Sequence, residues 1–294
     1  MDAFLDLPRH IGILGPVMNY DHRDYFMSGQ DVTDAFTAFA AGLALAVTDA
    51  DCPAALQAAR AARKVITVGR SPDADYRITS IQPALGAWRI VNRQGRTVLA
   101  LHAPHRGPAL WLNASRAAIA VLELGAAASV IRDGMTAYRG VSRRLELRHS
   151  GNGVLMLDDY AHNPAQISAL AEALRGYYPQ RRLIAVFEPR QHRRTALYCA
   201  EFGQALAAFD ACLLLPISPG LGDETYGQQA SISMLHEAAA RHGNSRVVTC
   251  GGYEDAASTL ASMVRAGDVV VSLGTGRPYL VLDRLAASAG CAAS

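Results

Sequence analysis

The chain has 294 residues, of which 50% are apolar and 18% are charged, so it can bury one large core or two modest ones, and we expect two domains. Its formal net charge is +2, which gives no strongly basic surface, so we expect no nucleic-acid partner. It has no run of eighteen apolar residues, no signal peptide at its start and no Cys-x-x-Cys pair among its five cysteines, so we expect a cytoplasmic protein with reduced thiols and no membrane partner.

The first half of the chain begins with a buried strand over residues 10–18, followed by an alanine-rich helix over 31–48. Between 64 and 101, short β-branched runs alternate with Gly, Pro, Asp and Asn, which is typical of strands and hairpins. Two helices are predicted next, over 113–125 and 126–138. This half therefore reads as a small domain built on a mixed sheet.

After residue 153 the pattern changes to apolar strands that alternate with amphipathic helices. The predicted strands cover 154–159, 182–189, 211–217, 245–250 and 268–274, and the helices cover 164–177, 195–208, 229–242, 253–265 and 278–287. Such alternation indicates a parallel, doubly wound sheet, in which ligands collect beyond the carboxyl ends of the strands. We therefore expect an α/β protein, with a mixed-sheet domain over 1–139 and a doubly wound, Rossmann-like domain over 140–294.

Three polar clusters each follow a predicted strand, and the first is Asn-Tyr-Asp-His-Arg-Asp-Tyr-Phe over 19–26. Asp21, His22 and Asp24 bring two carboxylates and an imidazole close together, a set that suits a divalent cation or a general base. An aspartate that caps a helix beside a histidine with ordinary hydrogen bonds would give the same pattern. The spacing leaves both interpretations open.

The second cluster, Leu-Asp-Asp-Tyr-Ala-His-Asn-Pro over 157–164, lies where the first strand of the doubly wound domain ends. Asp158 or Asp159 could orient a substrate ammonium group or a nucleotide sugar, and His162 could bind a phosphate or the substrate. Polar residues before a proline in the first helical turn are also ordinary helix capping. Capping does not explain two adjacent acids together with Tyr160 and His162, so a ligand site and a capping role both stay open.

The third cluster spans 187–197 and carries four basic residues around a predicted helix start: Arg190, His192, Arg193 and Arg194. Guanidinium groups at a helix N-terminus can bind phosphate or carboxylate groups, and a solvated basic loop is the alternative. A weaker signal is the glycine-rich turn over 272–280, which spells Gly-x-Gly-x-x-Tyr and is not a dinucleotide-binding fingerprint.

Taken in chain order, these clusters resemble the Mur ligase family, whose members use ATP to join an amino acid or peptide to a UDP-muramyl carboxylate in peptidoglycan synthesis. Residues 20–26 are similar to a segment of the family's central domain, residues 140–148 to the join between the central and C-terminal domains, and residues 158–164 to the C-terminal signature. Residues 183–190 look like the tripeptide-recycling branch of the family, and residues 193–195 like its alanine-adding branch.

The resemblance implies that 1–139 is part of the family's central, ATPase-type domain and that 140–294 is its C-terminal domain, with the family's N-terminal domain not matched. ATP and Mg²⁺ are the implied cofactors, and a UDP-muramyl-type substrate and an amino acid or peptide are the implied partners. The implied catalytic residues are His22, which is also the implied metal ligand, Asp159, His162 and Arg194. The implied nucleotide contacts are Asn113, Asp158, Asp159, Tyr160, Asn163 and Arg190.

The chain also departs from the family pattern. The family's phosphate-binding loop (P-loop) ends in Gly-Lys-Thr, whereas the single lysine here, Lys64, follows Arg63. Asn19 stands where the family has a glutamate, and of the expected adenine-side His-Asn pair only Asn113 is evident.

These departures lead to two functional hypotheses. The first is a Mur-type ligase that is incomplete as given and does not ligate alone, with a possible partner chain that supplies the P-loop half. The alternative is a catalytically inactive Mur-like protein that binds a nucleotide or muramyl peptide, or docks on a partner ligase. An α/β protein with ordinary loop polarity is a third reading, which the family order of the clusters disfavours.

Overall fold

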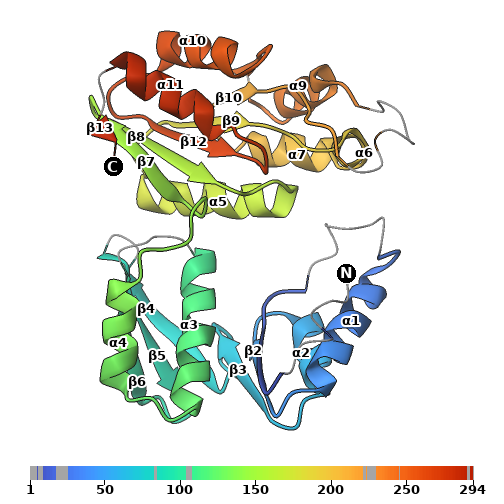
Figure 1. The fold of residues 1–294 in the computed structure, drawn as a ribbon, viewed down its shortest axis with the longest axis vertical. Helices are drawn as coiled ribbons and strands as arrows, with labels where there is room; N and C mark the ends of the chain where they lie inside the picture. The colour runs from blue at the N-terminus through green and yellow to red at the C-terminus, as the bar shows by residue number, and fades with distance from the viewer. Residues whose placement is uncertain are drawn as a thin grey trace. The chain divides into compact units, whose positions relative to one another are not determined.

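The computed structural model describes residues 5, 9–17, 26–82, 85–103, 108–220, 223, 230–244, 246–289 and 292–293 (Figure 1). The chain divides into two compact units, Met1–Arg139 (unit 1) and Gly140–Ser294 (unit 2), each with its own sheet and its own apolar core. The predicted fold class, α/β with a mixed-sheet part followed by a doubly wound part, is confirmed.

Unit 1 contains a six-stranded sheet whose strands follow one another in chain order: β1 (Ile11–Leu14), β2 (Leu45–Asp49), β3 (Val65–Gly69), β4 (Tyr76–Gln82), β5 (Ala87–Asn92) and β6 (Thr97–His102). Its helices are α1 (Gly29–Ala41), α2 (Pro53–Ala59), α3 (Pro108–Glu123) and α4 (Ala128–Ala137). β1 to β4 are parallel, whereas β4, β5 and β6 pair antiparallel. Antiparallel pairs need only short turns, which matches the four-residue connections from β4 to β5 and from β5 to β6.

The predicted helix over 31–48 is wrong in its second half. α1 begins after Ser28, where a capping box joins the Ser28 hydroxyl to the Asp31 N–H and the Asp31 carboxylate to the Ser28 N–H. It ends at Ala41, and Leu45–Asp49 forms β2, which is buried along its whole length. The alanine-rich composition favours a helix, but burial between helices on both faces of a parallel sheet selects a strand.

α3 packs on the sheet through a face that includes a buried arginine. The Arg116 side chain is 1% exposed, and its Nη2 lies 2.5 Å from Oδ2 of Asp49, the last residue of β2. Its Nη1 donates to Oδ1 of Asn113 at 2.9 Å, and Ser115 accepts a 2.9 Å hydrogen bond from Nε1 of Trp88. These contacts join α3 to β2 and β5, because a buried polar group needs a partner.

Unit 2 contains a seven-stranded sheet in the order β11 (Val247–Thr249), β10 (Ala211–Leu214), β9 (Leu183–Phe187), β12 (Val269–Leu273), β8 (Val154–Asp159), β7 (Glu146–Gly151) and β13 (Ala292–Ala293). Its helices include α5 (Pro164–Tyr177), α6 (His192–Leu197), α7 (Cys199–Leu206), α9 (Ile232–Arg241), α10 (Tyr253–Met263) and α11 (Tyr279–Ala289). The strands from β11 to β8 are parallel, and β7 pairs antiparallel with β8. α5 and α7 cover one face and α10 and α11 the other (Figure 1), which is the predicted doubly wound arrangement.

The helix bounds in unit 2 follow the prediction closely at α5 and less closely at the next helix. α5 covers Pro164–Tyr177 as predicted, with a proline in its first turn. The single helix predicted over 195–208 is instead two helices, α6 and α7, which meet at Tyr198.

No helix among the described residues is long and apolar enough to span a bilayer.

Gly203 marks the closest approach of α7 and α9. A Cβ added there would lie 2.6 Å from the carbonyl carbon of Ala238 and 2.7 Å from its Cβ. We expect Gly203→Ala to destabilise unit 2 by about 1–3 kcal/mol, because two packed helix backbones must move apart. Gly176→Ala is the matched control on α5, where a new Cβ meets nothing within 4 Å, and it should stabilise by up to about 1 kcal/mol. Urea unfolding followed by far-UV circular dichroism compares the two, and effects of the same sign and size would contradict the close approach.

Candidate functional site

The ends of three neighbouring strands in unit 2 line up at one edge of the sheet. Leu273, the last residue of β12, is in register with Asp159 of β8 on one side and with Phe187 of β9 on the other. The loops that follow these strands therefore start side by side: 160–163, 188–190 and 274–277. This carboxyl edge of unit 2 brings the second and third polar clusters together with the glycine-rich turn, at the place where doubly wound sheets bind ligands.

Asp158 is fully buried near the end of β8. Its Oδ2 lies 2.8 Å from Nε of Arg143, and its Oδ1 accepts a 2.5 Å hydrogen bond from the Ser272 hydroxyl. Both carboxylate oxygens are thus held by protein donors, which supports a structural role for this side chain.

Asp159 is buried at the end of β8, where its carboxylate accepts hydrogen bonds of 2.8 Å from the N–H groups of Leu145 and Ala161. Burial raises the pKa of Asp159 above its ordinary value because desolvation disfavours the charged form, and the two backbone hydrogen bonds and the charge of Arg144 offset this only in part. Carboxyl groups with raised pKa values are typical of functional sites, although ion-pair networks also produce them.

We expect Asp159→Asn to change how the stability of unit 2 depends on pH. Because the folded-state pKa of Asp159 is raised, its contribution to stability is fully present below the ordinary value of 3.8 and is lost as the pH rises through the folded-state pKa. The wild-type free energy of unfolding should therefore fall relative to that of the variant as the pH rises from about 4 toward neutrality. Urea denaturation at stepped pH measures this difference, and a difference that does not vary with pH would refute the raised pKa.

Tyr160, His162 and Asn163 follow directly in the loop after β8. Asn163 caps α5, since its Oδ1 accepts a 2.9 Å hydrogen bond from the Gln166 N–H, so the capping alternative holds for this residue. The partly exposed His162 ring donates from Nδ1 to the Tyr160 carbonyl at 2.9 Å and meets the Tyr160 ring edge-on, with ring centroids 5.4 Å apart. The guanidinium of Arg144 lies 5.5 Å from the Tyr160 ring centroid. Tyr160 and His162 thus offer aromatic and basic surface to a ligand.

The third cluster surrounds the start of α6. The carboxylate of Asp223 accepts 3.0 Å hydrogen bonds from the N–H groups of His192 and Gly220 and a 3.4 Å hydrogen bond from the Arg193 N–H. Burial opposes the ionisation of Asp223, but these backbone hydrogen bonds outweigh it and lower its pKa. The first amides of α6 therefore already bind a protein carboxylate.

The guanidinium groups of the third cluster differ in exposure. Arg190 is exposed and lies in an isolated β-bridge with Ser218, while Arg194 on α6 is partly buried. Beside them Glu188 is buried, and its Oε2 accepts hydrogen bonds from the Tyr253 hydroxyl (2.9 Å) and the Arg277 N–H (3.0 Å). The acid near this edge is thus held by protein donors, and Arg190 extends positive charge into solvent.

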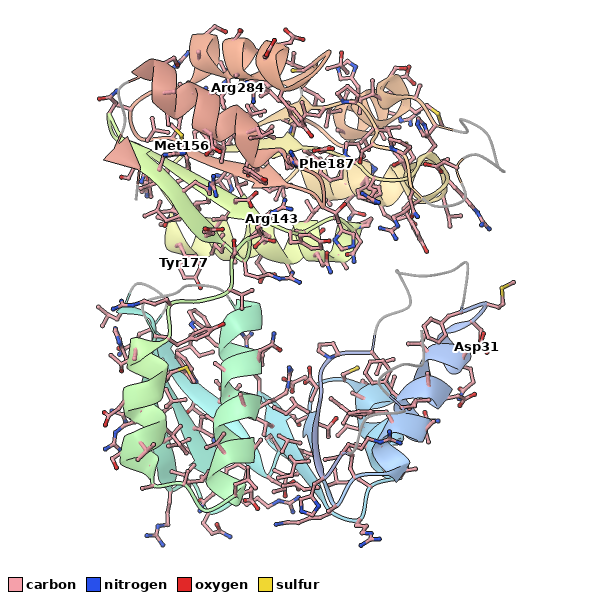
Figure 2. All side chains as sticks on the ribbon, viewed as in Figure 1. Asp31, Arg143, Met156, Tyr177, Phe187 and Arg284 are labelled. Carbon is pink, nitrogen blue, oxygen red and sulfur yellow. The ribbon has the colours of Figure 1, made fainter. Side chains whose placement is uncertain are left out.

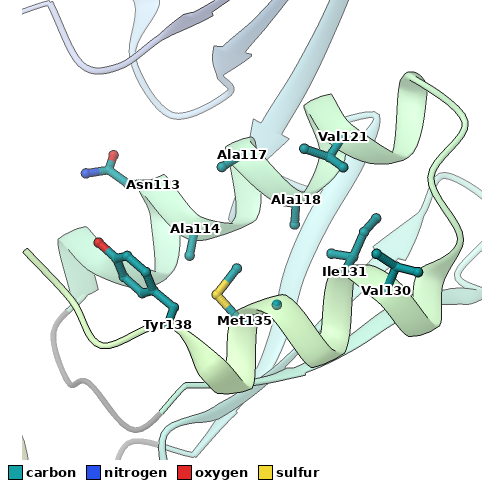
Figure 3. Close-up of a pocket in the computed structure, with 10 residues that line it drawn as sticks. Asn113, Ala114, Ala117, Ala118, Val121, Val130, Ile131, Met135 and Tyr138 are labelled. Atoms are coloured by element: carbon teal, nitrogen blue, oxygen red, sulfur yellow. The ribbon is translucent and has the colours of Figure 1, made fainter.

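Asn113 lies on α3 in unit 1, at one end of a groove between α3 and α4 with a cavity volume of about 470 Å³ (Figure 3). Small and apolar side chains line most of this groove, and the side-chain oxygen of Asn113, Oδ1, accepts a hydrogen bond from Arg116.

The predicted metal ligand, His22, lies outside the described residues. In the part of the chain that the structure describes, no three His, Cys, Asp or Glu side chains are grouped to hold a metal ion.

Sequence reasoning missed three residues that shape this edge. Arg143 precedes β7 and reaches Asp158 because the β7–β8 pairing places Glu146 opposite Asp158. Asp223 lies 31 residues from the His192 amide that it binds, and Glu188 lies within 183–190, where the family resemblance implies no role for an acid. The Ser-Gly-Asn-Gly run over 150–153 is a turn signal for a hairpin before the acid pair, and such a hairpin places Arg143 and Arg144 near the strand end.

Comparison with known proteins identifies the family. Residues 143–276 match the Mur ligase, glutamate ligase domain. The UDP-N-acetylmuramate–L-alanine ligase of Kineococcus radiotolerans is 33% identical over 266 residues, which cover 87% of this chain and 55% of that protein. The ligase of the same name from Acidothermus cellulolyticus is 32% identical over 301 residues, which cover 97% of this chain and 61% of that protein. The chain thus spans between 55% and 61% of the length of these relatives.

Solved structures share the fold. The UDP-N-acetylmuramate–alanine ligase of Thermotoga maritima matches with a TM-score of 0.78 and 17% identity, over 98% of this chain and 61% of that one. The MurF ligase of Thermotoga maritima, solved in complex with ADP, matches with a TM-score of 0.72 and 18% identity, over 94% of this chain and 61% of that one. At these identities the likeness establishes the fold.

The mixed sheet of unit 1 and the doubly wound sheet of unit 2 together define a protein with the Mur ligase fold. Residues 143–276 carry a Mur ligase domain, and the resemblance to the Mur ligase family read from the sequence is confirmed.

Proposed function

We propose that the chain is part of an ATP-dependent ligase that joins an amino acid or a peptide to the carboxylate of a UDP-muramyl-type substrate through an acyl phosphate. The observation that carries this proposal is the alignment of three strand ends in unit 2, which gathers Tyr160, His162 and Arg190 at one edge. The names of the relatives support this substrate pair. In this proposal 1–139 is part of the central, ATPase-type domain and 140–294 is the C-terminal domain.

The proposed roles follow from what each side chain can offer. Arg190 and Arg194 would balance the negative charge of a nucleotide or an acyl phosphate. The hydrogen bond from Nδ1 of His162 to the Tyr160 carbonyl fixes the orientation of the ring. Asp159 and His162 are proposed to face the incoming amine.

ATP and Mg²⁺ are the cofactors that this proposal requires. The exposed guanidinium of Arg190 fits the charge of a nucleotide, and Tyr160 lies at the same edge of the sheet, in the loop after β8, which β12 separates from β9. Four other proposed nucleotide contacts already have protein partners, namely Asn113, Asp158, Asp159 and Asn163. Magnesium supplies charge neutralisation in phosphoryl transfer, but the described residues hold no ligand group for it, and the proposed ligand His22 lies outside them.

The second candidate function is a Mur-like protein that binds a nucleotide or muramyl peptide without turnover, or docks on a partner ligase. The contact between Arg116 and Asn113 favours it, because it occupies the one adenine-side residue that matches the family. The 294 residues also hold no Gly-Lys-Thr loop, so phosphate binding of the family type needs a further segment, for which a partner chain remains a proposal.

A ligation assay separates these candidates. The chain is incubated with ATP, Mg²⁺, UDP-N-acetylmuramate and L-alanine, with and without the unmatched front part of the Acidothermus cellulolyticus ligase, and ADP and the amide product are quantified. We expect no product from the chain alone and coupled ADP and product release when the front part is present. Ligation by the chain alone would overturn the incomplete-ligase proposal, and ligand binding without product in both mixtures would favour the second candidate.

A further inference from the structure

We propose that Arg143 is a positioning residue that holds Tyr160 and the turn 274–277 in the arrangement a ligand meets at the carboxyl edge of unit 2. The proposal rests on the proposed function for the identity of that ligand. It rests on the structure for the geometry, because one guanidinium binds two other segments of the chain, β8 and the turn after β12.

The guanidinium of Arg143 uses each of its nitrogens. Nε donates to Asp158 at 2.8 Å, Nη2 to the Gly274 carbonyl at 2.7 Å and Nη1 to the Thr275 carbonyl at 3.2 Å. The planar fork of arginine suits this set, since it directs donors to an acid and to two carbonyls in one plane. The side chain is 20% exposed, so water competes little for these contacts.

The guanidinium of Arg143 also lies over two tyrosine rings. Its guanidinium carbon lies 5.1 Å from the ring centroid of Tyr160 and 5.1 Å from that of Tyr279. Its carbonyl accepts a 2.8 Å hydrogen bond from the Tyr160 N–H, and its backbone adopts φ +61, a left-handed value that surrounding contacts must hold in place. Figure 2 shows Arg143 near the segment that leads into β7. Arg143 therefore fixes both the backbone and the ring of Tyr160.

The contacts with Gly274 and Thr275 also orient hydrogen-bond donors. A trans peptide directs its N–H opposite to its C=O, so carbonyls that face Arg143 turn the N–H groups of Thr275 and Gly276 away from it. Within the described residues neither N–H has an acceptor, and the buried Thr275 hydroxyl has no partner. Arg143 thus sets the direction of donors that an anionic or carbonyl oxygen of a ligand can use.

Arg181 offers a matched control at the opposite edge of the same sheet. Its guanidinium donates to the carbonyls of Gly153, Gly267 and Asp268 and lies 5.7 Å from the ring centroid of Tyr178. Both arginines therefore bind backbone carbonyls and stack on tyrosine in unit 2. Only Arg143 does so where the strands β8, β9 and β12 end.

Amide hydrogen exchange on the full chain tests the positioning itself. In Arg143→Lys, a lysine can still pair with Asp158 but loses the planar fork, so we expect the amides of Gly274 and Arg277 to exchange faster by on the order of tenfold. In Arg181→Lys these two amides should keep their wild-type rates. Unchanged exchange in Arg143→Lys, or equal acceleration in both variants, would overturn the proposal.

The dissociation constant for ADP with Mg²⁺ tests the consequence for binding. We expect Arg143→Lys to bind at least about tenfold more weakly and Arg181→Lys to bind as the wild type does, although both variants lose a similar number of hydrogen bonds. Tyr279→Leu removes one stacking face and should weaken binding in the same direction, which keeps the test informative when Arg143→Lys folds poorly. Binding within twofold of wild type in Arg143→Lys would overturn the positioning role. A wild-type chain that does not bind ADP would instead overturn the nucleotide part of the proposed function, and the exchange rates would still decide the role of Arg143.

Discussion

Arg116→Met should destabilise unit 1 by about 3–5 kcal/mol, because it leaves the Asp49 carboxylate buried without its counter-charge. The two side chains are 1% and 5% exposed, and the Arg116–Asp49 contact is 2.5 Å long. Burial lowers the pKa of Arg116, and the charge of Asp49 opposes that shift, so each side chain is the buried counter-charge of the other. The loss should therefore far exceed what removal of one surface ion pair produces.

Two further variants isolate the ion pair. The double variant Asp49→Leu/Arg116→Met should recover most of the lost stability, because it removes both charges and keeps apolar volume. Lys64→Met breaks the exposed pair between Lys64 and Glu123, whose lysine side chain is 61% exposed, and should change stability by less than about 1 kcal/mol. Both tryptophans of the chain, Trp88 and Trp111, lie in unit 1, so their fluorescence during urea unfolding reports this unit. A loss of unfolding free energy in Arg116→Met that is smaller than the loss in Lys64→Met would contradict the role of the buried pair.

Gly274→Ala should destabilise unit 2 by about 2–5 kcal/mol through two effects that add. Gly274 has φ +132, which side-chain-bearing residues rarely adopt, and a Cβ there would lie 2.5 Å from the Glu188 carbonyl oxygen. That carbonyl belongs to the neighbouring strand end at the carboxyl edge, so relief of the clash must move the loop after β9 or the turn after β12. We therefore expect Gly274→Ala to weaken ligand binding at this edge as well as to lower the stability of unit 2.

Gly267→Ala separates backbone strain from the close approach. Gly267 also has a positive φ, +97, but a Cβ there meets nothing within 4 Å. We expect it to cost about 1–2 kcal/mol, the contribution of backbone strain alone. Far-UV circular dichroism during urea unfolding measures both variants, and equal losses would show that the turn at Gly274 is not tightly packed.

Much of the fold follows from sequence periodicity. The alternation of buried strands and amphipathic helices after residue 153 predicts the doubly wound sheet, and Pro164 sets the start of α5. The sequence did not predict β2, because Leu45–Asp49 continues an alanine-rich run that favours a helix. The strand is evident only from its burial in the folded structure. Local patterns thus predict elements well where capping residues mark their ends, and poorly where tertiary burial overrides composition.

The sequence predicted where the candidate site lies better than it predicted which side chains can bind a ligand there. The polar clusters do gather at one sheet edge, because parallel strands end together. The pairing of Asp158 with Arg143 depends on strand register, and the capture of the α6 amides by Asp223 depends on a contact across 31 residues. Arg116 in an alanine-rich helix gives no hint of burial, since its partner Asp49 is 67 residues away. Long-range contacts therefore decide which of these side chains can bind a ligand, and local sequence patterns do not predict such contacts.

Amide chemical shifts followed during a titration of the full chain with ADP and Mg²⁺ test most directly whether a ligase ligand binds where β8, β9 and β12 end. The predicted result is saturable shifts within 160–163, 188–190 and 274–277, with Gly153 and Gly267 at the opposite edge unchanged. An absence of saturable shifts in these three loops, or shifts confined to the opposite edge, would contradict a ligand site at the carboxyl edge of unit 2.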